Sequence, residues 1–253
     1  MRQQKRERHG KILAALGLAS NLRVTDLARQ LGVSTETIRR DFDELTHAGM
    51  LNRTYGGAVS SLGASNTTGA KQDLFHAERQ RIAEATVTQV ADARILLIGS
   101  GATTVRVAQQ IAAQLKNITV VTHAFGVAQA LANNGTIEVM MIPGLYHPEE
   151  ASTTGGHAIV FLQSLYVDYV ILGASGLTGD GPGSAVPEIA AVNAAMLGRA
   201  EKCIVTADRS AFNLHYATRY ADWPRVSKLV TDAQPPPALL NTLRKSQVEL
   251  LVV

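Results

Sequence analysis

The sequence predicts an α/β protein of two units, an N-terminal winged helix-turn-helix domain followed by a larger domain with a mostly parallel, Rossmann-like sheet. Three observations predict this. Residues 24–59 combine two short amphipathic helices, a glycine turn and a hairpin-like end. Residues 95–253 alternate short apolar runs with alanine-rich helical stretches. Residues 60–70 are small, polar and aperiodic, which is typical of a linker. We therefore divide the chain into domain 1–59, linker 60–74 and domain 75–253.

The first helix predicted in this head follows Thr25 and Asp26, either of which can cap it. It carries Leu27 and Leu31 four residues apart, so both lie on one face. Gly32 can adopt a left-handed conformation and is expected to end this helix.

The second helix is the predicted reading helix. Ser34 can cap its start, and Ile38, Phe42 and Leu45 form an apolar stripe at spacings of four and three. The opposite face holds hydroxyls and two guanidiniums near the helix start, where a helix-turn-helix reads the major groove. These residues are Thr35, Thr37, Arg39, Arg40 and Asp43.

Residues 50–58 alternate and then turn, which predicts a β-wing with Arg53 near its tip. Paired short helices also occur in proteins that bind no DNA. The combination of cap, stripe, outward arginines and basic wing favours double-stranded DNA as the partner. The residues predicted to bind it are Ser34, Thr35, Thr37, Arg39, Arg40, Arg53 and Tyr55.

The charge distribution agrees with this. Residues 1–60 hold ten Lys and Arg against six Asp and Glu, whereas the remainder holds 14 against 15. Five basic residues crowd the start of the chain and could contact phosphates: Arg2, Lys5, Arg6, Arg8 and Lys11. DNA binding should therefore weaken as salt rises.

Composition excludes several other classes. Aromatic residues make up 5%, too few for a base-stacking platform, and the single cysteine, Cys203, excludes an intrachain disulfide or a cysteine-based metal site. No metal or cofactor is expected. The basic start followed by Ile12–Ala19 is similar to a signal peptide, but Glu7 interrupts the charge and the apolar run is short. We expect a cytoplasmic protein.

The larger domain is predicted to contain seven strands and four helices. The strands are Ile95–Ile98, Ile118–Val121, Val139–Ile142, Tyr169–Leu172, Ile204–Val205, Leu229–Val230 and Leu250–Val253. The helices are Val105–Leu115, Ala124–Ala132, Glu188–Ala200 and Ala238–Lys245. Ligands of such sheets bind at the carboxyl ends of the strands.

Polar and glycine residues follow several of these strands. The clearest run is Gly99–Thr104, GSGATT, which ends a strand and opens a helix, so its amides and hydroxyls suit a phosphate. It has neither the lysine of a P-loop nor the full glycine pattern of a dinucleotide site. Similar groups stand at 122–124, 173–176 and 207–210. His123 could also be purely structural, and Asp208 and Arg209 could simply pair with each other.

The chain resembles the DeoR-type transcriptional repressors. The resemblance is strongest in VSTETIRRDFDEL and RTYGGAV, and continues through Phe75, Glu78 and Arg79. It then follows GSGATT, VVTHA, PGLYHPEEASTTGG, DYVILGASGL, Met196 and ADRSAF. The resemblance implies a C-terminal domain similar to the sugar-phosphate isomerase fold, oligomers, and a phosphorylated sugar or related metabolite as effector.

Several positions depart from the family's usual pattern. The family usually has aspartate at Gly99, threonine at Ala102, asparagine at His123, and lysine near Asn193 and at Ala211. Losing cations should weaken anion binding. The effector-binding residues carried over are Ser100, Gly101, Thr103, Thr104, His123, Asp208 and Arg209.

The expected function is therefore that of a repressor of a carbohydrate or related metabolic operon, binding its operator as a dimer or tetramer, with no catalytic residues and no membrane partner. Two alternatives stay open. The larger domain could be an active sugar-phosphate isomerase with an accessory DNA-binding head, with Asp208 or Glu188 as base. It could also be a regulator whose effector pocket is degenerate.

Overall fold

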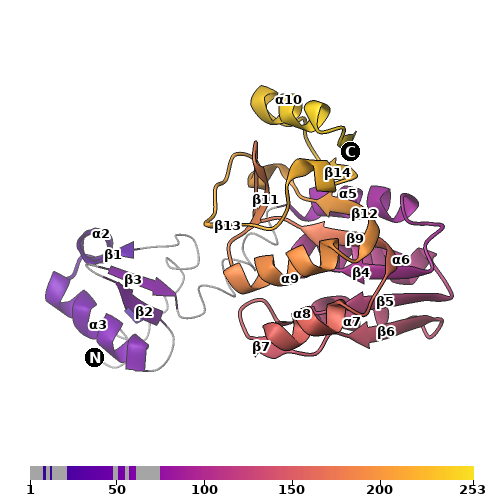
Figure 1. Cartoon of the computed structure of the whole chain (residues 1–253). Helices are drawn as coiled ribbons and strands as arrows, with labels where there is room; N and C mark the ends of the chain where they lie inside the picture. The colour runs from indigo at the N-terminus through magenta and orange to yellow at the C-terminus, as the bar shows by residue number, and fades with distance from the viewer. Residues whose placement is uncertain (1–7, 10–11, 13–21, 48–50, 55–56, 61–74) are drawn as a thin grey trace. The chain divides into compact units, whose positions relative to one another are not determined.

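A computed structural model of the chain describes residues 8–9, 12, 22–47, 51–54, 57–60 and 75–253. The chain divides into two compact units, residues 1–74 and 75–253 (Figure 1). Each unit is described by itself. The predicted linker 60–74 lies outside the described residues except for Ser60.

In the part of the N-terminal unit that the structure describes, helices α2 and α3 accompany a small antiparallel sheet of strand order β1-β3-β2. Its elements are β1 (Leu22–Arg23), α2 (Val24–Leu31), α3 (Thr35–His47), β2 (Leu51–Thr54) and β3 (Gly57–Ser60). The helix-turn-helix and the wing predicted from the sequence are both present.

Local sequence explains most of the helix boundaries in this unit. Gly32 has φ +64° and follows the last residue of α2. Ser34 precedes α3 and caps it, as predicted. The predicted caps of the first helix were wrong: α2 begins at Val24, so Thr25 and Asp26 lie in its first turn.

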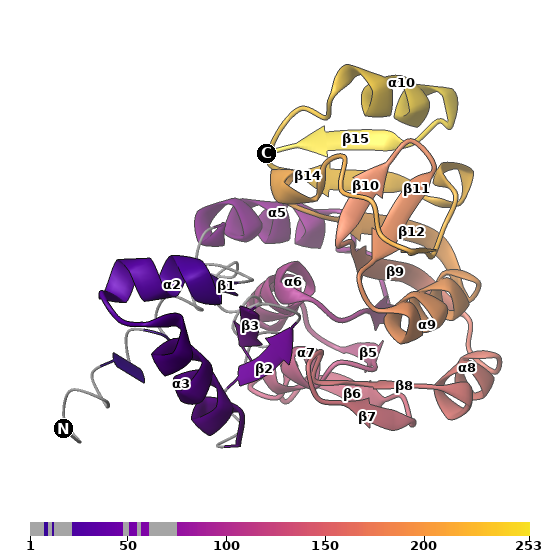
Figure 2. The same ribbon diagram turned by 90° about the vertical axis from the view of Figure 1, so that its left-hand side faces the viewer.

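The C-terminal unit is built on a seven-stranded, fully parallel sheet of order β15-β14-β12-β9-β4-β5-β6. In that order the strands are Glu249–Val252, Lys228–Thr231, Ala200–Thr206, Val167–Gly173, Ile95–Ile98, Ile118–Thr122 and Ile137–Met141. Figure 2 shows β15 and helix α10 at one end of the sheet and β6 at the other.

Helices cover both faces of this sheet, because its strands alternate their side chains between two apolar clusters. Leu96 and Ile98 pack with α5 (His76–Thr88), α6 (Ala102–Gln114) and α7 (Phe125–Leu131). Leu97 packs in the cluster of the other face. That face is covered by α8 (Gly156–Leu162), α9 (Pro187–Leu197) and α10 (Pro237–Lys245).

The strand order reverses between β4 and β9. From β4 the chain builds outward through β5 to β6, and from β9 it builds the opposite way through β12 and β14 to β15. In open parallel sheets the ligand crevice lies at the carboxyl ends of the strands beside such a reversal. The loops that follow β4 and β9 therefore flank the expected ligand position.

All seven predicted strands and all four predicted helices exist; Ile95–Ile98 has the predicted bounds, and the others have shifted ends. The largest difference is at β12, which spans Ala200–Thr206 where the sequence predicted only Ile204–Val205. Ala200, predicted to end a helix, is the first residue of this strand. Helices α5 and α8 were not predicted. Five short strands were also missed: β7 (Leu145–His147), β8 (Ser152–Thr154), β10 (Gly176–Thr178), β11 (Gly181–Ser184) and β13 (Thr218–Arg219). Two 3-10 turns complete the unit, η1 (Arg209–Ala211) and η2 (Trp223–Arg225).

Candidate functional site

Helix α3 is held by its cap at one end and by its apolar stripe along one side. The Ser34 hydroxyl oxygen accepts a hydrogen bond from the Thr37 amide at 3.1 Å and lies 2.8 Å from the Thr37 hydroxyl. The predicted stripe of Ile38, Phe42 and Leu45 is buried in the core of the head, together with Ile12 and Leu27. The stripe fixes which face of α3 is turned outward.

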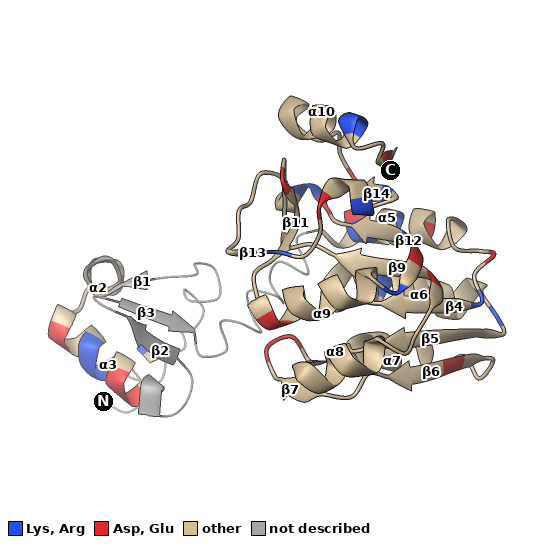
Figure 3. Ribbon diagram, in the orientation of Figure 1, with Lys and Arg blue, Asp and Glu red and all other residues tan. Residues whose placement is uncertain are grey.

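The outward face of α3 carries the two predicted arginines. The side chains of Arg39 and Arg40 are 58% and 77% exposed. Their acidic neighbour is Glu36, at 3.9 Å from Arg39 and 3.5 Å from Arg40, and Figure 3 shows this sequence of charges along the helix. Exposed pairs of this kind contribute under about 1 kcal/mol, so they do not keep either guanidinium from an anionic partner. Thr35, the first residue of α3, is also exposed.

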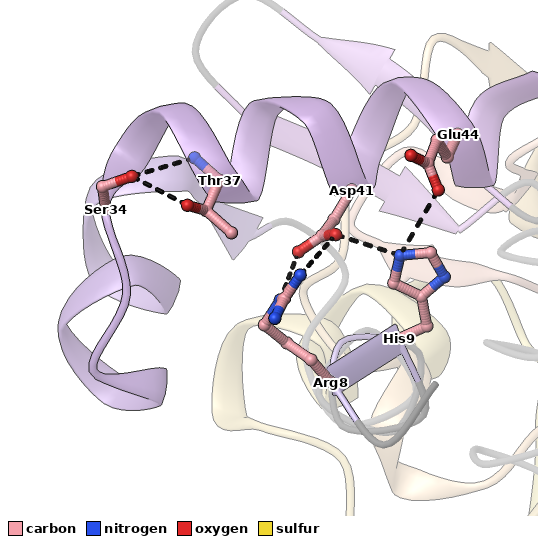
Figure 4. A network of polar contacts seen from close by, with 6 residues as sticks. All are labelled: Arg8, His9, Ser34, Thr37, Asp41 and Glu44. Atoms are coloured by element: carbon pink, nitrogen blue, oxygen red, sulfur yellow. Dashed lines mark hydrogen bonds and ion pairs between the residues drawn. The ribbon is translucent and has the colours of Figure 1, made fainter. Parts of the chain in front are cut away.

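Asp41, on the same helix, has a structural role: its side chain is buried and paired within the head. Its side chain is only 3% exposed, and it accepts two hydrogen bonds from the Arg8 guanidinium at 2.5 and 2.9 Å (Figure 4). The His9 Nε2 atom lies 3.0 Å from the same carboxylate. Burial by itself would raise the pKa of Asp41, but the hydrogen bonds and charges of Arg8 and His9 outweigh it and hold the pKa below its usual range.

Arg8 therefore corrects one expectation. It was grouped with the basic residues that could contact phosphates, but its guanidinium faces a buried carboxylate of its own head. Arg2, Lys5, Arg6 and Lys11 lie outside the described residues.

The wing is a hairpin of β2 and β3. Leu51 pairs with Ser60 at its open end and Thr54 pairs with Gly57 nearest the turn. Arg53 is one pair further back, opposite Ala58, so the backbone places it near the tip as predicted. Tyr55, in the turn itself, lies outside the described residues.

In the C-terminal unit, residues 99–101 form the loop between β4 and α6, and residues 102–104 form the first turn of α6. Gly101, with φ +134°, directly precedes α6, a conformation that glycine adopts without strain. The amides of residues 101–104 have no hydrogen-bond acceptor among the described residues, because they begin the helix. Free amides and the helix dipole together favour an anion here.

The hydroxyls of this loop are largely covered. Ser100 and Thr103 are 7% and 8% exposed, and the Thr104 hydroxyl donates to the Gly101 carbonyl at 2.9 Å. The end of β9 lies against them: a Cβ on Gly173, its last residue, would stand 3.3 Å from the Ser100 carbonyl oxygen and 3.8 Å from Thr104 Cγ2. The carboxyl end of β9 is therefore packed against the loop that follows β4.

His123 supports this loop from the end of β5. Its ring is fully buried, its Nε2 accepts a hydrogen bond from the Ser100 amide at 3.1 Å, and its Nδ1 lies 2.9 Å from the Thr153 carbonyl oxygen. These partners require a proton on Nδ1 and none on Nε2. Burial lowers the pKa of His123 to about 4, so the ring is neutral near pH 7. Both nitrogens are in use, which favours a role in positioning Ser100.

Asp208 and Arg209 are engaged with α5. Asp208 accepts a hydrogen bond from the Arg79 guanidinium at 2.8 Å, and this ion pair is buried. Arg209 contacts Glu78 at 2.7 Å and Asp232 at 2.8 Å. The two predicted site residues therefore pair with other acids and bases of the chain and not with each other. The other carboxylate oxygen of Asp208 accepts hydrogen bonds from the amide and the hydroxyl of Ser210, so both of its oxygens are engaged within the chain.

Asn193, on α9, was not among the predicted site residues. It is 2% exposed, and its Oδ1 atom is buried without a hydrogen-bond partner. A Cβ on Gly99 would stand 3.2 Å from that oxygen. The one available signal was the departure from the family's lysine near this position.

Three further expectations concern Cys203, metal binding and membranes. Cys203 is a buried free thiol, and burial raises its pKa to about 12, so it is a structural residue. Among the described residues there is no cluster of three or more His, Cys, Asp or Glu side chains that could hold a metal. None of the described helices is long and apolar enough to span a bilayer.

Two family models match the chain. The model of the DeoR-like helix-turn-helix domain matches residues 8–62, and that of the DeoR C terminal sensor domain matches residues 74–233. The chain belongs to the DeoR family. The second match includes the loop after β4, His123, Asn193 and Asp208.

Curated DeoR-family relatives match over nearly their whole length. The HTH-type transcriptional repressor CsqR of Escherichia coli (strain K12) is 28% identical, covering 97% of this chain and 94% of its own. The putative aga operon transcriptional repressor of Escherichia coli O157:H7 is 29% identical, with 98% and 93% covered. The glycerol-3-phosphate regulon repressor of Escherichia coli (strain K12) is 24% identical, with 96% and 97% covered.

The chain also has a distant likeness to solved structures. Ribose 5-phosphate isomerase A of Methanocaldococcus jannaschii is 12% identical, with a TM-score of 0.40 and 54% of each chain covered. A likeness at this level supports no argument about activity.

Proposed function

We propose that this DeoR-family protein is a transcriptional repressor of a carbohydrate or related metabolic operon. Its head binds an operator duplex as part of a symmetric oligomer, with α3 in the major groove and the wing beside it. A phosphorylated sugar or similar metabolite binds at the loop after β4 and changes operator affinity. We favour induction, in which the bound metabolite lowers the affinity for the operator.

The observation that carries the DNA-binding part is the pair Arg39 and Arg40. Both guanidiniums project from the exposed face of a capped helix whose opposite face is buried. Arginine donates a planar fork of hydrogen bonds to guanine edges or to phosphates. Neither arginine is held by a buried acid, unlike Arg8, so both are available to DNA.

The effector part is supported by the free amides at the start of α6 and by the reversal of strand order beside it. For such a metabolite to regulate DNA binding, it must bind the DNA-competent and DNA-incompetent arrangements unequally. The relatives that are named as repressors of an aga operon and a glycerol-3-phosphate regulon support this metabolic class.

The DNA-binding test compares three single variants by fluorescence anisotropy on a duplex selected by the wild-type protein from a random pool. Arg39→Ala and Arg40→Ala should each weaken binding by about 1–3 kcal/mol. Removing an arginine that contacts only phosphate should also reduce the slope of log K against log salt concentration by about one. Arg81→Ala is the matched control, since it removes the same charge from an exposed position on α5. Unchanged affinity in both head variants would contradict the proposed docking.

The effector test screens inorganic phosphate, glycerol 3-phosphate, ribose 5-phosphate and glucose 6-phosphate. A compound present at 100 times its Kd should stabilise the C-terminal unit by about 2.7 kcal/mol. A bound compound should also shift operator affinity in the anisotropy assay. If no compound in an extended panel of phosphate esters does either, the effector part of the proposal fails. Turnover of a sugar phosphate by the purified protein would favour the isomerase alternative instead.

A further inference from the structure

We infer that Asn193 is the specificity-determining residue of the effector site: its Oδ1 accepts a hydrogen bond from an uncharged hydroxyl of a monophosphate ester whose phosphate lies at the start of α6. The inference rests on the proposed function, because it concerns the same site. It names the class of ligand more narrowly, as a hydroxylated ester with a single anionic group.

The first step is the state of the Asn193 side chain. The residue is 2% exposed, and its Oδ1 atom is buried without a hydrogen-bond partner. Buried polar side chains are nearly always hydrogen-bonded, because an unpaired group loses its water contacts without replacement. An unpaired buried amide is therefore a position where a ligand can supply the missing partner.

The second step is location. The Oδ1 atom of Asn193 lies 3.2 Å from the position that a Cβ on Gly99 would occupy. Gly99 is in the short loop that leads into α6. The Cδ2 atom of Leu172, at the end of β9, lies 3.0 Å from that same position. Asn193 comes from α9, which covers one face of the sheet, and the free amides come from α6, which covers the other face. Both lie near the point between β4 and β9 where the strand order reverses.

The third step is charge. An amide cannot neutralise a phosphate, so Asn193 contributes selectivity for the uncharged part of a ligand. His123, which holds the Ser100 amide, is neutral, and Arg209 is paired with Glu78 and Asp232. Arg79 is paired with Asp208, although its Nη1 atom is buried without a hydrogen-bond partner. A second anionic group placed at Asn193 would meet the partial negative charge of its unpaired carbonyl oxygen, so we expect bisphosphates and carboxylated esters to bind more weakly than monophosphate esters.

The experiment measures the selectivity ratio of the full-length protein by isothermal titration calorimetry. Propyl phosphate, which has no hydroxyl, is compared with the tightest of glycerol 3-phosphate, ribose 5-phosphate and glucose 6-phosphate. In the wild type the hydroxylated ester should bind about tenfold more tightly than propyl phosphate. In Asn193→Leu the ratio should fall to about twofold, while the Kd for propyl phosphate stays the same within about twofold.

Three further variants separate this effect from others. Met196→Leu changes the packing of the same helix at a buried position and should keep the tenfold ratio. Thr103→Val, at the start of α6, should weaken all esters alike. Asn193→Ala, which also removes the acceptor, serves if Asn193→Leu fails to fold, as judged by circular dichroism.

The outcomes distinguish the two proposals. If esters bind and the ratio is unchanged in the Asn193 variants, or falls equally in Met196→Leu, the inference is overturned while the proposed function stands. Equal or tighter binding of fructose 1,6-bisphosphate would also overturn it. If no phosphate ester binds the wild type, the effector part of the proposed function and this inference fail together.

Discussion

The ion pair of Asp41 with Arg8 gives a sharp prediction about the stability of the DNA-binding head. Asp41→Ala removes a carboxylate that is 3% exposed and accepts two hydrogen bonds from Arg8 and one contact from His9. Removing one partner of a buried pair costs about 3–5 kcal/mol. Arg8 and His9 are 21% and 20% exposed and can regain water, so we expect about 2–3 kcal/mol.

That loss is large for a domain of this size. At about 0.05–0.15 kcal/mol per residue, a head of some 60 residues has a total stability of roughly 3–9 kcal/mol. A loss of about 2–3 kcal/mol corresponds to a fall in Tm of roughly 10–20 °C for a domain this small. A substantial fraction of Asp41→Ala heads would then be unfolded at 37 °C, and operator binding would fall with them.

The chain offers a built-in way to separate the two units. Its single tryptophan, Trp223, is buried in the C-terminal unit, where its indole N–H donates to the Thr178 carbonyl at 2.8 Å. Tryptophan fluorescence therefore reports that unit alone, whereas far-ultraviolet circular dichroism reports both. In Asp41→Ala the dichroism should begin to change at lower temperature while the fluorescence transition stays in place.

Two comparisons make the prediction specific. Glu36→Ala removes an exposed acid of the same helix and should change stability by no more than about 0.5 kcal/mol. Arg8→Ala combined with Asp41→Ala should destabilise less than the sum of the single changes, since the two residues share one interaction. Strict additivity, or an effect of Asp41→Ala no larger than that of Glu36→Ala, would refute the reasoning.

The same pair also sets a pH dependence. Because the pKa of Asp41 is depressed in the folded head, the unfolded chain binds the proton first as the pH falls. The stabilisation is thus fully present well above the unfolded value of about 3.9 and is lost as the pH falls through the lower folded value. Asp41→Asn should remove this part of the acid sensitivity.

Three further predictions concern the C-terminal unit, and all can be measured by the Trp223 transition. Arg79→Leu leaves Asp208 buried without its ion-pair partner and should cost about 3–5 kcal/mol, while Arg79→Leu with Asp208→Leu should cost less than the sum of the two single changes. His123, with a folded pKa of about 4 against an ordinary 6.5, should make this unit lose up to about 3 kcal/mol as the pH falls from 6.5 to 4, and His123→Asn should flatten that dependence. Gly181→Ala places a Cβ 2.0 Å from the Ala221 carbonyl oxygen at φ +143° and should destabilise by more than about 2 kcal/mol; an unchanged Tm would show that this turn can move.

Periodicity predicted those parts of the fold that depend on neighbours in sequence. The stripe of Ile38, Phe42 and Leu45 gave the orientation of α3, and short apolar runs gave the seven strands of the sheet. The strand ends were less well predicted. The second and third residues of β12, Glu201 and Lys202, are exposed and carry no apolar signal although they belong to the strand.

Side-chain pairs that join distant parts of the chain could not be predicted. Arg8 pairs with a residue 33 positions away and Arg79 with one 129 positions away, and no local pattern records either spacing. A cluster of basic residues is usually exposed, which made a phosphate contact the natural interpretation for Arg8. For His123, the residue type was noticed but its role depends on the Ser100 amide and the Thr153 carbonyl, which only the folded sheet brings together.

The contacts of α5 have a mechanical consequence. This helix begins just after residue 74, and its first turn is joined to the strand ends of the sheet through Glu78 with Arg209 and Arg79 with Asp208. A force that acts on Phe75 from the N-terminal side is therefore passed through these ion pairs to the carboxyl ends of the strands of the seven-stranded sheet. Inserting residues before this point would lengthen the reach between the two units but leave that point of attachment in place.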